Sequence, residues 1–301
     1  MFFLQVCENM MTECPYPKGK CRIKWVTTDW LQDHLEDKNM MIVDIQPNIH
    51  DYVQEHIPGA VYMEEGCLRT FFKRRPGVWA QTEQIEAVFG RLGIKPELPL
   101  VIYTGEGQFK HWGDGLEQTM AAYSLVRFGH DNVMILDGGI DKWRNEKREV
   151  TKVFPERDQT DFLAEVRDEY FMEYQEFKEA KDNDDVILLD ARPAAFYEGW
   201  GPWIKPGHIP GAVSFPWRKL MADDNPRQLK PDNALMDMIE KAGITKDKLV
   251  ICSCGTGREA TNEFSLFKFY LQYPRVKLHE GAFTEWTSYP ENPTVTGKNP
   301  R

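Results

Sequence analysis

The sequence has no long apolar run and no excess of basic residues. No stretch approaches about eighteen consecutive apolar residues, so a membrane span is not expected. Acidic residues number 47 and basic residues 37, which gives a formal net charge of −10. Because a negative surface repels phosphate backbones, neither a nucleic acid nor a membrane is expected as a partner.

Cysteine is scarce as well, with six in 301 residues, which is too few for a disulfide-bonded scaffold of this size. Cys7, Cys14 and Cys21 are spaced more widely than the close cysteine pairs of zinc sites, so no metal is expected there. We interpret residues 1–23 as an N-terminal extension, and the sequence assigns no role to its cysteines. Cys67 is isolated, and we expect it to be a small buried apolar side chain.

The first residues also lack the features of a signal peptide. MFFLQVCENMM has no basic segment ahead of a long apolar stretch. This indicates a cytoplasmic protein, or a periplasmic one if the N-terminus has been processed.

The chain does have an ordinary globular composition and an internal repeat. Hydrophobic residues make up 42% and charged residues 28%, which allows a folded core in each of two domains. The run Met41–Asp44 is followed by His56–Ala60 (HIPGA), and Ile187–Asp190 is followed by a second HIPGA at His208–Ala212. Because further strand, turn and tryptophan signals follow in the same order in both halves, we interpret the chain as a duplicated domain.

Each half alternates short apolar runs with helical spacing, which predicts a parallel sheet with helices on both faces. The predicted fold class is α/β, with two similar domains at residues 24–146 and 170–290. Residues 147–169 are charged and contain Pro155, so we expect a linker that wraps across one domain. Residues 291–301 are expected to form a C-terminal tail. The expected strands lie at Ile42–Val43, Leu100–Tyr103, Val133–Leu136, Val186–Leu189, Leu249–Ser253 and Val276–Leu278.

One loop between a strand and a helix carries a candidate nucleophile. In Cys254-Gly-Thr-Gly-Arg-Glu259, the backbone N–H groups and the helix N-terminus form a cradle for an anion. A free thiol has a pKa of about 8.5, and lowering it by about two units needs about 2.7 kcal/mol, which such donors could supply. We therefore expect Cys254 to be a thiolate, and the same donors would stabilise a persulfide.

These residues resemble the active site of the rhodanese family of sulfurtransferases. The likeness is carried by Cys254-Gly-Thr-Gly257, the two HIPGA segments and Asp190-Ala-Arg192, and it spans about residues 24–290. The CGTG loop is similar to that of multi-domain bacterial sulfurtransferases. The resemblance implies a tandem pair of rhodanese-like domains, of which only the C-terminal one is catalytic. In agreement, Thr104 stands at the position of Cys254 in the first half, and a hydroxyl cannot form a stable persulfide.

The mechanism that the resemblance implies is a two-step sulfur transfer. The Cys254 thiolate attacks the outer sulfur of thiosulfate and releases sulfite. The persulfide then passes its sulfur to a thiophilic acceptor, which is cyanide, a thiol or a protein. No metal and no organic cofactor is expected. Two alternatives stay open, 3-mercaptopyruvate as the donor and a sulfur-carrier or interaction protein without turnover.

The length and the sequence of the loop bear on the substrate. Rhodanese-fold phosphatases resemble this chain but have a longer loop that ends in an arginine, and Ala260 stands at that position here, so a phosphatase is not expected. The loop is only partly similar to the CG-S/A-G-V-T of mercaptopyruvate sulfurtransferases and the CRKGVT of mammalian-type rhodaneses. A carboxylate facing the sulfur would raise the thiol pKa and repel an anionic donor. We expect Glu259 to point outward or to pair with Arg258.

Further candidates follow from position in the motif. Arg192 matches a family position that holds the donor's anionic group, and the structural alternative is an ion pair with Asp190. Trp200 and Trp203 are expected either to wall the cleft or to pack in the core. His56 is expected to fix a turn or to face the cleft. The full set of expected substrate-binding residues is Gly255, Thr256, Gly257, Arg258, Glu259 and Arg192.

Two features have competing interpretations. Cys252 lies two residues before Cys254, on the same side of a regular strand, and could resolve a persulfide into a disulfide. A buried structural side chain is the favoured interpretation. The basic run Lys73–Arg75 is interpreted as solvated surface that could attract an anionic donor.

Overall fold

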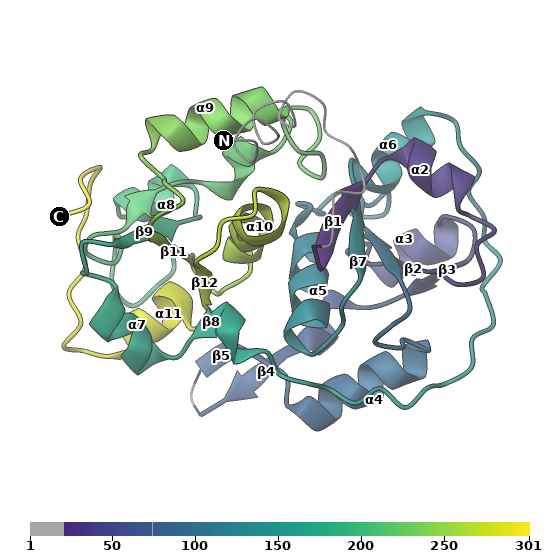
Figure 1. The fold of residues 1–301 in the computed structure, drawn as a ribbon, viewed down its shortest axis with the longest axis horizontal. Coiled ribbons are helices and arrows are strands. Elements are labelled where there is room, and N and C mark those ends of the chain that lie inside the picture. The colour runs from purple at the N-terminus through teal and green to yellow at the C-terminus, as the bar shows by residue number, and fades with distance from the viewer. Residues whose placement is uncertain (1–20, 74) are drawn as a thin grey trace, which may run out of the picture.

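The computed structural model describes residues 21–73 and 75–301, and each half of this part of the chain folds around a five-stranded parallel sheet (Figure 1). The first sheet consists, in spatial order, of β1 (Ile23–Val26), β7 (Val133–Leu136), β6 (Leu100–Tyr103), β2 (Met41–Asp44) and β3 (Ala60–Tyr62). The second consists of β8 (Phe171–Met172), β12 (Val276–His279), β11 (Leu249–Ser253), β9 (Val186–Asp190) and β10 (Val213–Ser214). Counted along the chain within each half, both sheets have the same strand order. The predicted duplication and α/β class are confirmed, and all six expected strands are present.

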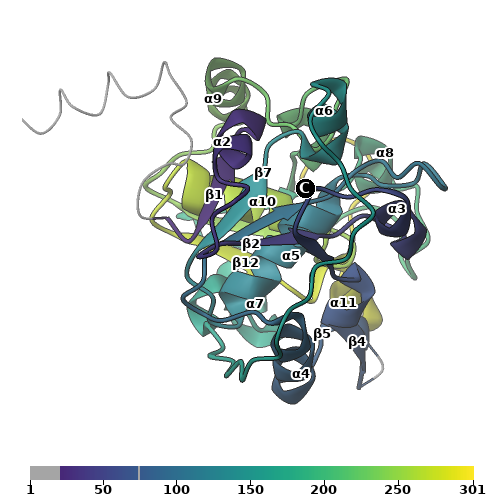
Figure 2. The same cartoon turned by 90° about the vertical axis from the view of Figure 1, so that its right-hand side faces the viewer.

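Helices cover both faces of each sheet, as the predicted fold requires. The helices of the first half are α2 (Thr28–Asp33), α3 (Ile49–Gln54), α4 (Thr82–Leu92), α5 (Leu116–Arg127) and α6 (Gly139–Asn145). Apolar side chains of α2 and α6 form a cluster on one sheet face, and those of α4 and α5 pack on the other. Figure 2 views the molecule from the side of this half.

The second half repeats this arrangement. They are α7 (Tyr174–Ala180), α8 (Ala194–Glu198), α9 (Asp232–Lys241), α10 (Glu259–Ser265), which continues into a π-helical turn, η4 (Leu266–Tyr270), and α11 (Ala282–Ser288). Apolar residues of α7, α8 and α11 form one cluster, and those of α9 and α10 lie on the opposite face. Residues 21–73 and 75–301 also contain three short 3₁₀ turns: η1 (Glu65–Leu68), η2 (Asp168–Tyr170) and η3 (Trp217–Leu220).

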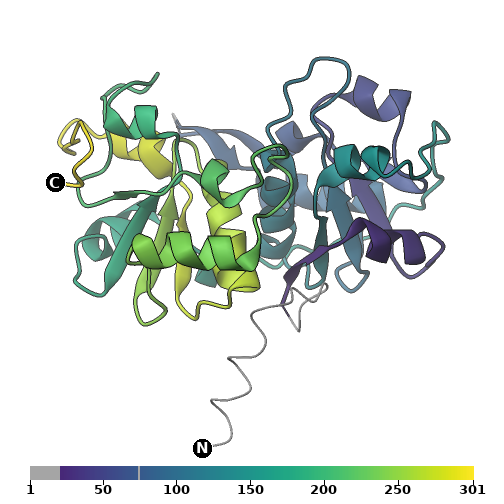
Figure 3. The ribbon, with the colours of Figure 1, turned by 90° about the horizontal axis from the view of Figure 1, so that it is seen from above.

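The two halves pack side by side through α5 and α10 (Figure 3). Every residue of α5 from Leu116 to Val126 is buried, because its outer face is covered by the second half. The rings of Tyr123 and Phe264 meet edge to face with centroids 5.2 Å apart. One apolar cluster runs through both halves, so the interface is an extension of their cores.

A hairpin that the sequence did not predict reaches across this interface. It is formed by β4 (Arg69–Phe72) and β5 (Arg75–Trp79), which pair antiparallel. Arg75 forms an ion pair with Glu285 of the second half, whose side chain is only 5% exposed. The interpretation of this basic run as solvated surface is therefore wrong for Arg75, whereas Lys73 is exposed and Arg74 lies outside the described residues.

The segment between the halves runs along the first half without helix or strand at residues 152–167. The amide of Thr160 donates to the carbonyl of Gly90 at 2.9 Å. Phe162 is buried against Phe89, with ring centroids 5.1 Å apart. The linker thus covers the outer side of α4.

The two HIPGA histidines occupy equivalent places and are fully buried. The imidazole of His56 lies 3.1 Å from the carbonyl of Val153, and that of His208 lies 3.1 Å from the carbonyl of Asn299. Each ring thereby fastens the chain segment that follows its own half. The possibility that His56 faces the interdomain cleft is wrong, because its ring is enclosed within the first half.

Candidate active site

The loop after the central strand of the second sheet directs backbone amides at a sulfur atom. β11 ends at Ser253, Cys254 follows, and α10 begins at Glu259 as expected. The N–H of Gly257 donates to Sγ of Cys254 at 3.1 Å, and hydrogen bonds from the amides of Thr256 and Ala260 also favour its thiolate. Gly257 adopts a φ of +86°, which disfavours a side chain at this turn. The predicted cradle around the sulfur is therefore present.

The ionisation of the thiol differs from the expectation. Cys254 is only 1% exposed. Burial, followed by the charge and hydrogen bond of Glu259, raises the pKa of Cys254 well above its ordinary value, and the amides oppose this only in part. The expectation of a resting thiolate is wrong, because desolvation and a neighbouring carboxylate outweigh the backbone donors.

Glu259, which we expected to lie away from the sulfur, contributes to the raised pKa of Cys254. Its charge and its hydrogen bond both raise the pKa of Cys254, and Oε2 is buried without a hydrogen-bond partner among the described residues. The expectation that Glu259 points outward or pairs with Arg258 is wrong. Because Glu259 is the first residue of α10, its position follows from where the loop ends.

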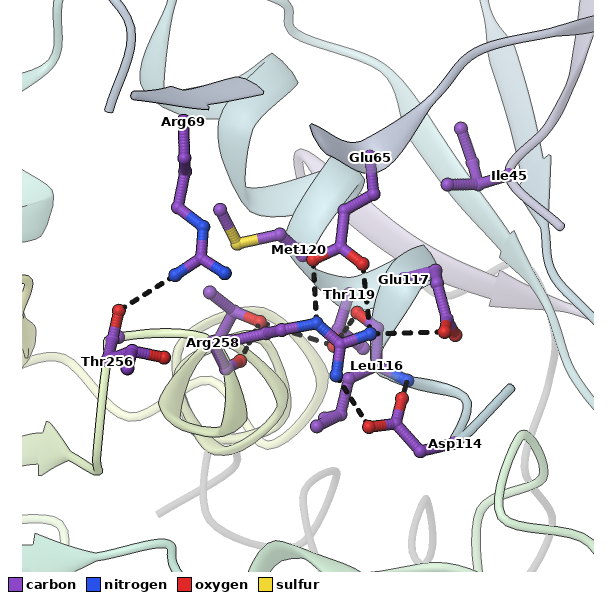
Figure 4. A network of polar contacts seen from close by, with 12 residues as sticks. Ile45, Glu65, Arg69, Asp114, Leu116, Glu117, Thr119, Met120, Thr256 and Arg258 are labelled. Carbon is purple, nitrogen blue, oxygen red and sulfur yellow. Dashed lines mark hydrogen bonds and ion pairs between the residues drawn. The ribbon is translucent and has the colours of Figure 1, made fainter. Parts of the chain in front are cut away.

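Arg258 instead binds three carboxylates of the first half (Figure 4). Nε and Nη2 donate to the two oxygens of Glu65 at 2.6 and 2.9 Å. Nη1 donates to Asp114 at 2.6 Å, and Nη2 lies 3.1 Å from Glu117. These carboxylates raise the pKa of Arg258 despite its burial. The loop arginine therefore holds the two halves together.

Arg69 is a site residue that the sequence did not reveal. It lies at the start of β4, and its Nη1 donates to the carbonyl of Thr256 at 2.9 Å across the interface (Figure 4). Burial lowers the pKa of Arg69, while nearby negative charges, Glu65 foremost, act in the opposite direction. An arginine stays charged under such conditions, so the first half supplies a cation beside the loop.

A hollow of about 460 Å³ lies between the first half and Arg258 of the loop. Arg69, from β4 of the first half, also lines it. Its other side chains are mostly acidic or polar, with one exposed tryptophan: Gln46, Pro47, Glu64, Glu65, Trp112, Asp114 and Glu117. Within residues 21–73 and 75–301 no group of three His, Cys, Asp or Glu side chains is placed to hold a metal ion.

Only one of the two candidate wall tryptophans contacts the loop. A Cβ atom on Gly255 would lie 2.2 Å from the ring of Trp203, so Gly255 allows a close approach. Nε1 of Trp203 donates to Thr284, which in turn donates to the carbonyl of Gly255 at 2.7 Å. Trp200 is 70% exposed and stacks on Phe196, which places it away from the loop.

Arg192 forms the ion pair with Asp190 that was the alternative to binding the donor. It is fully buried, its Nη2 lies 2.6 Å from Asp190, and it donates to the carbonyl of Gly207 at 2.9 Å. Its guanidinium lies 4.9 Å from the ring centroid of Trp203, so it adjoins the loop through that tryptophan. A direct role of Arg192 in donor binding stays a prediction.

Cys252, Cys67 and Thr104 are enclosed or hydrogen-bonded within their own halves. Cys252 is fully buried, and its pKa is raised by burial and by the charge of Glu263. Cys67 is half-buried rather than buried, and its Sγ donates to the carbonyl of Glu64. Thr104 is buried and donates to the carbonyl of Ile45 at 3.0 Å.

The fold is that of a two-domain α/β protein with equivalent sheets. In the second domain, Cys254 follows the central strand of the sheet and lies in the loop before α10. The sequence model of the Rhodanese-like domain matches residues 27–146 and 173–289. The chain belongs to this family and carries its domain twice.

Individual relatives cover nearly the whole chain. A thiosulfate sulfurtransferase of Azotobacter vinelandii is 30% identical, over 87% of this chain and 93% of its own. The sulfur carrier protein TtuD of Thermus thermophilus is 29% identical, over 91% and 96%. The crystal structure of SseA, a 3-mercaptopyruvate enzyme of Escherichia coli, is 28% identical over 86% and 98%, with a TM-score of 0.75. The curated names thus support sulfurtransferase function and are divided between two donors.

No helix in the described ranges combines the length and the hydropathy that a bilayer span needs.

Proposed function

We propose that this protein is a sulfurtransferase that moves a sulfane sulfur from thiosulfate to cyanide or another thiophilic acceptor through a persulfide on Cys254. The observation that carries the proposal is the N–H of Gly257, which points at Sγ from 3.1 Å within a loop of converging amides. The thiosulfate sulfurtransferase among its relatives supports the choice of donor.

The backbone amides of the loop would stabilise an anion on sulfur, although the site as a whole favours the neutral thiol at rest. Once the thiol proton has left, Sγ displaces sulfite from the outer sulfur of thiosulfate and becomes a persulfide. The N–H groups that face Cys254 would then hydrogen-bond an anionic disulfur group in a site with little water. Neither a metal nor an organic cofactor is needed for this exchange.

The first half acts as a partner wall without a nucleophile of its own. Thr104 stands where the second half has Cys254, and its hydroxyl is engaged by the backbone. Arg69 and Glu65 come from this half and contact the loop segment 256–258. We assign Arg69 to attraction of the anionic donor and Trp203 to exclusion of water beside the loop.

Besides small thiols, another protein is a candidate acceptor of the persulfide sulfur. TtuD is named a sulfur carrier, which fits transfer of the persulfide sulfur to another chain. The net charge of −10 opposes nucleic acid as a partner.

Intact mass after incubation with thiosulfate tests the persulfide. Wild-type protein is expected to gain one sulfur atom and to lose it with cyanide. Cys254→Ser is expected to gain none, while Cys252→Ser, the neighbouring matched control, gains it as the wild type does. Labelling of Cys254→Ser, or loss of labelling in Cys252→Ser alone, would assign the nucleophile to another cysteine.

A second candidate donor is 3-mercaptopyruvate, and the inward position of Glu259 favours it. Thiosulfate carries two negative charges and 3-mercaptopyruvate one, so a carboxylate beside the sulfur repels the former more strongly. Parallel measurements of kcat/KM with both donors and cyanide as acceptor decide between them. Persulfide formation without multiple turnovers with either donor would instead indicate a sulfur carrier.

A further inference from the structure

One peptide unit of the loop is hydrogen-bonded at both of its ends. The N–H of Gly257 donates to Sγ of Cys254 at 3.1 Å. The carbonyl of Thr256, which belongs to the same peptide unit, accepts a hydrogen bond from Nη1 of Arg69 at 2.9 Å (Figure 4). The C=O and N–H of a trans peptide lie in one plane and point in opposite directions. A group that fixes this carbonyl therefore also fixes the direction in which the amide points.

The two carbonyls before it are held from within the second half. The carbonyl of Cys254 accepts from the N–H of Phe283 at 2.9 Å. The carbonyl of Gly255 accepts from the N–H of Thr284 at 3.0 Å and from its hydroxyl at 2.7 Å. Both donor residues belong to α11, which packs in the same half as the loop. The carbonyl of Thr256 differs, because its donor comes from the first half.

Arg69 stands on a firmly anchored base. It is the first residue of β4 and pairs in register with Trp79 of β5. Trp79 is only 3% exposed, and its Nε1 donates to the hydroxyl of Ser124 on α5 at 3.0 Å. The guanidinium that reaches the loop is therefore carried by the buried end of the hairpin.

The first half receives a matching contact from the second. Arg227 lies between β10 and α9, as Arg69 lies between β3 and α4. Its Nη1 donates to the carbonyl of Gly113 at 3.2 Å, in the loop between β6 and α5 that corresponds to the loop of Cys254. Each half thus extends an arginine to a loop carbonyl of the other, so the contact of Arg69 follows from the duplicated architecture. The loop of the first half has Thr104 in place of the thiol, so of the two contacts that of Arg69 bears on a sulfur atom.

We infer that Arg69 is a positioning residue, which holds the amide of Gly257 on Sγ of Cys254 by binding the carbonyl of the same peptide unit. This inference rests on the proposed sulfur transfer and adds a role that Arg69 performs before any donor binds. Hydrogen bonds in a chain polarise one another, and a charged donor strengthens the chain. As negative charge gathers on the sulfur, a cation from the other half therefore stabilises it through the peptide. The half without a nucleophile completes the sulfur site of its neighbour.

The test compares Arg69→Met with the wild type in the absence of a donor. Methionine keeps an unbranched stem but has no N–H group for the carbonyl of Thr256. In protein labelled with ¹⁵N-glycine, the Gly257 amide is assigned by its absence from the spectrum of Gly257→Ala. Its proton resonance is expected to move upfield in Arg69→Met, because the hydrogen bond to Sγ lengthens. Arg69→Lys, which keeps a charged donor, is expected to retain most of the wild-type position.

The second readout is the rate of persulfide formation in a single turnover with saturating thiosulfate. Saturation removes the part of the effect that comes from attraction of the donor. Arg69→Met is expected to be about tenfold slower than the wild type, a smaller loss than the about 100-fold expected when such an amide is removed from the site outright. Arg69→Lys is expected to recover most of this rate.

Arg75→Met is the matched control on the same hairpin. Arg75 also crosses the interface, but its partner is Glu285 and not a loop carbonyl. The variant therefore loosens the hairpin without removing a contact to the loop, and it is expected to leave the Gly257 resonance and the rate at saturation unchanged. If Arg69→Met proves unfolded, Arg69→Thr replaces it, because a branched side chain suits a strand and threonine is too short to reach the carbonyl.

The inference is overturned if the Gly257 resonance of Arg69→Met stays at its wild-type position, or if this variant forms persulfide at an undiminished rate at saturation. It is also overturned if Arg69→Lys recovers neither readout. Equal changes in Arg69→Met and Arg75→Met would overturn it as well, because loosening of the hairpin would then explain both. If wild-type protein forms no persulfide at all, the proposed function fails instead, and the Gly257 resonance still reports whether Arg69 positions the amide.

Discussion

The guanidinium of Arg258 reaches across the interface and forms a two-pronged ion pair with Glu65 of the other half, with N···O distances of 2.6 and 2.9 Å. The side chains of Arg258 and Glu65 are 19% and 17% exposed, so the pair is largely shielded from water. The loop that carries Cys254 and the domain interface are therefore parts of one network.

Replacement of Arg258 by alanine is expected to destabilise the protein markedly. It leaves the carboxylates of Glu65, Asp114 and Glu117 without their shared cation, and breaking such a buried pair costs about 3 kcal/mol. Urea unfolding measures the loss. Arg275→Ala is the matched control, because Arg275 and its partner Asp185 are 47% and 58% exposed, and a loss of about 0.5 kcal/mol or less is expected. Equal losses of unfolding free energy in the two variants would contradict the role of Arg258 in holding the two halves together.

Gly257→Ala is expected to impair sulfur transfer through the backbone. At a φ of +86° a Cβ atom would lie 2.9 Å from the carbonyl oxygen of Glu280 and 3.3 Å from the ring of Trp79, so the loop has to shift. Because the Gly257 amide then moves off the sulfur, persulfide formation should fall about 100-fold. Gly297→Ala shares the backbone cost at a φ of +88° but meets nothing within 4 Å, and it should keep the wild-type rate. An active Gly257→Ala would show that this amide is dispensable.

Arg69→Gln is expected to weaken the use of an anionic donor. The side chain keeps a hydrogen-bond donor for the carbonyl of Thr256 but loses the cation beside the loop. With thiosulfate, kcat/KM should fall about tenfold, equal to about 1.4 kcal/mol, chiefly through KM. Arg91→Gln removes a charge from the exposed end of α4 and should leave steady-state kinetics unchanged. Indistinguishable values for the two variants would remove Arg69 from the site.

His130 is expected to make stability depend on pH. It is fully buried, with Nε2 2.9 Å from the carbonyl of Leu98, and burial lowers its pKa from 6.5 to about 4. Between these two pKa values, His130 is protonated in the unfolded chain but neutral in the folded protein. This histidine therefore makes the folded state less stable as the pH falls from about 6.5 to about 4. The shift corresponds to about 3 kcal/mol.

Urea unfolding of His130→Gln at several pH values measures that contribution. The difference in unfolding free energy between wild type and variant should shrink as the pH falls through this window. His50→Gln makes the same substitution at an exposed position of α3 and is the control for the exchange itself. A constant difference for His130→Gln would mean that its ring is not held neutral.

The sequence revealed the parts of the fold that depend on local pattern. The buried strands β2, β6 and β11 are continuous apolar runs, and the repeated HIPGA turns mark the duplication. The sequence did not predict the hairpin of β4 and β5, because its strands are short and half-exposed and β5 contains Pro76, which is unfavourable in most strands. Missing the hairpin also meant missing Arg69 as a site residue.

The position of Cys254 and its amide cradle could be predicted from the loop, but its ionisation could not. The direction of its pKa depends on burial and on which way Glu259 turns, and both follow from packing between α10 and the first half. Likewise, Trp200 and Trp203 are equivalent in sequence terms, yet only the latter meets Gly255. Contacts across a domain interface leave no signal in a local pattern.

The apolar cluster that continues from one repeat into the other has an evolutionary consequence. Trp25 of the first repeat packs on Tyr270 of the second, and both belong to that common interior. A repeat taken from a relative would bring an ill-fitting surface to this shared interior, so the two copies have to change in step. Selection on the loop of Cys254 in one copy therefore also constrains the copy that has Thr104 at the equivalent position.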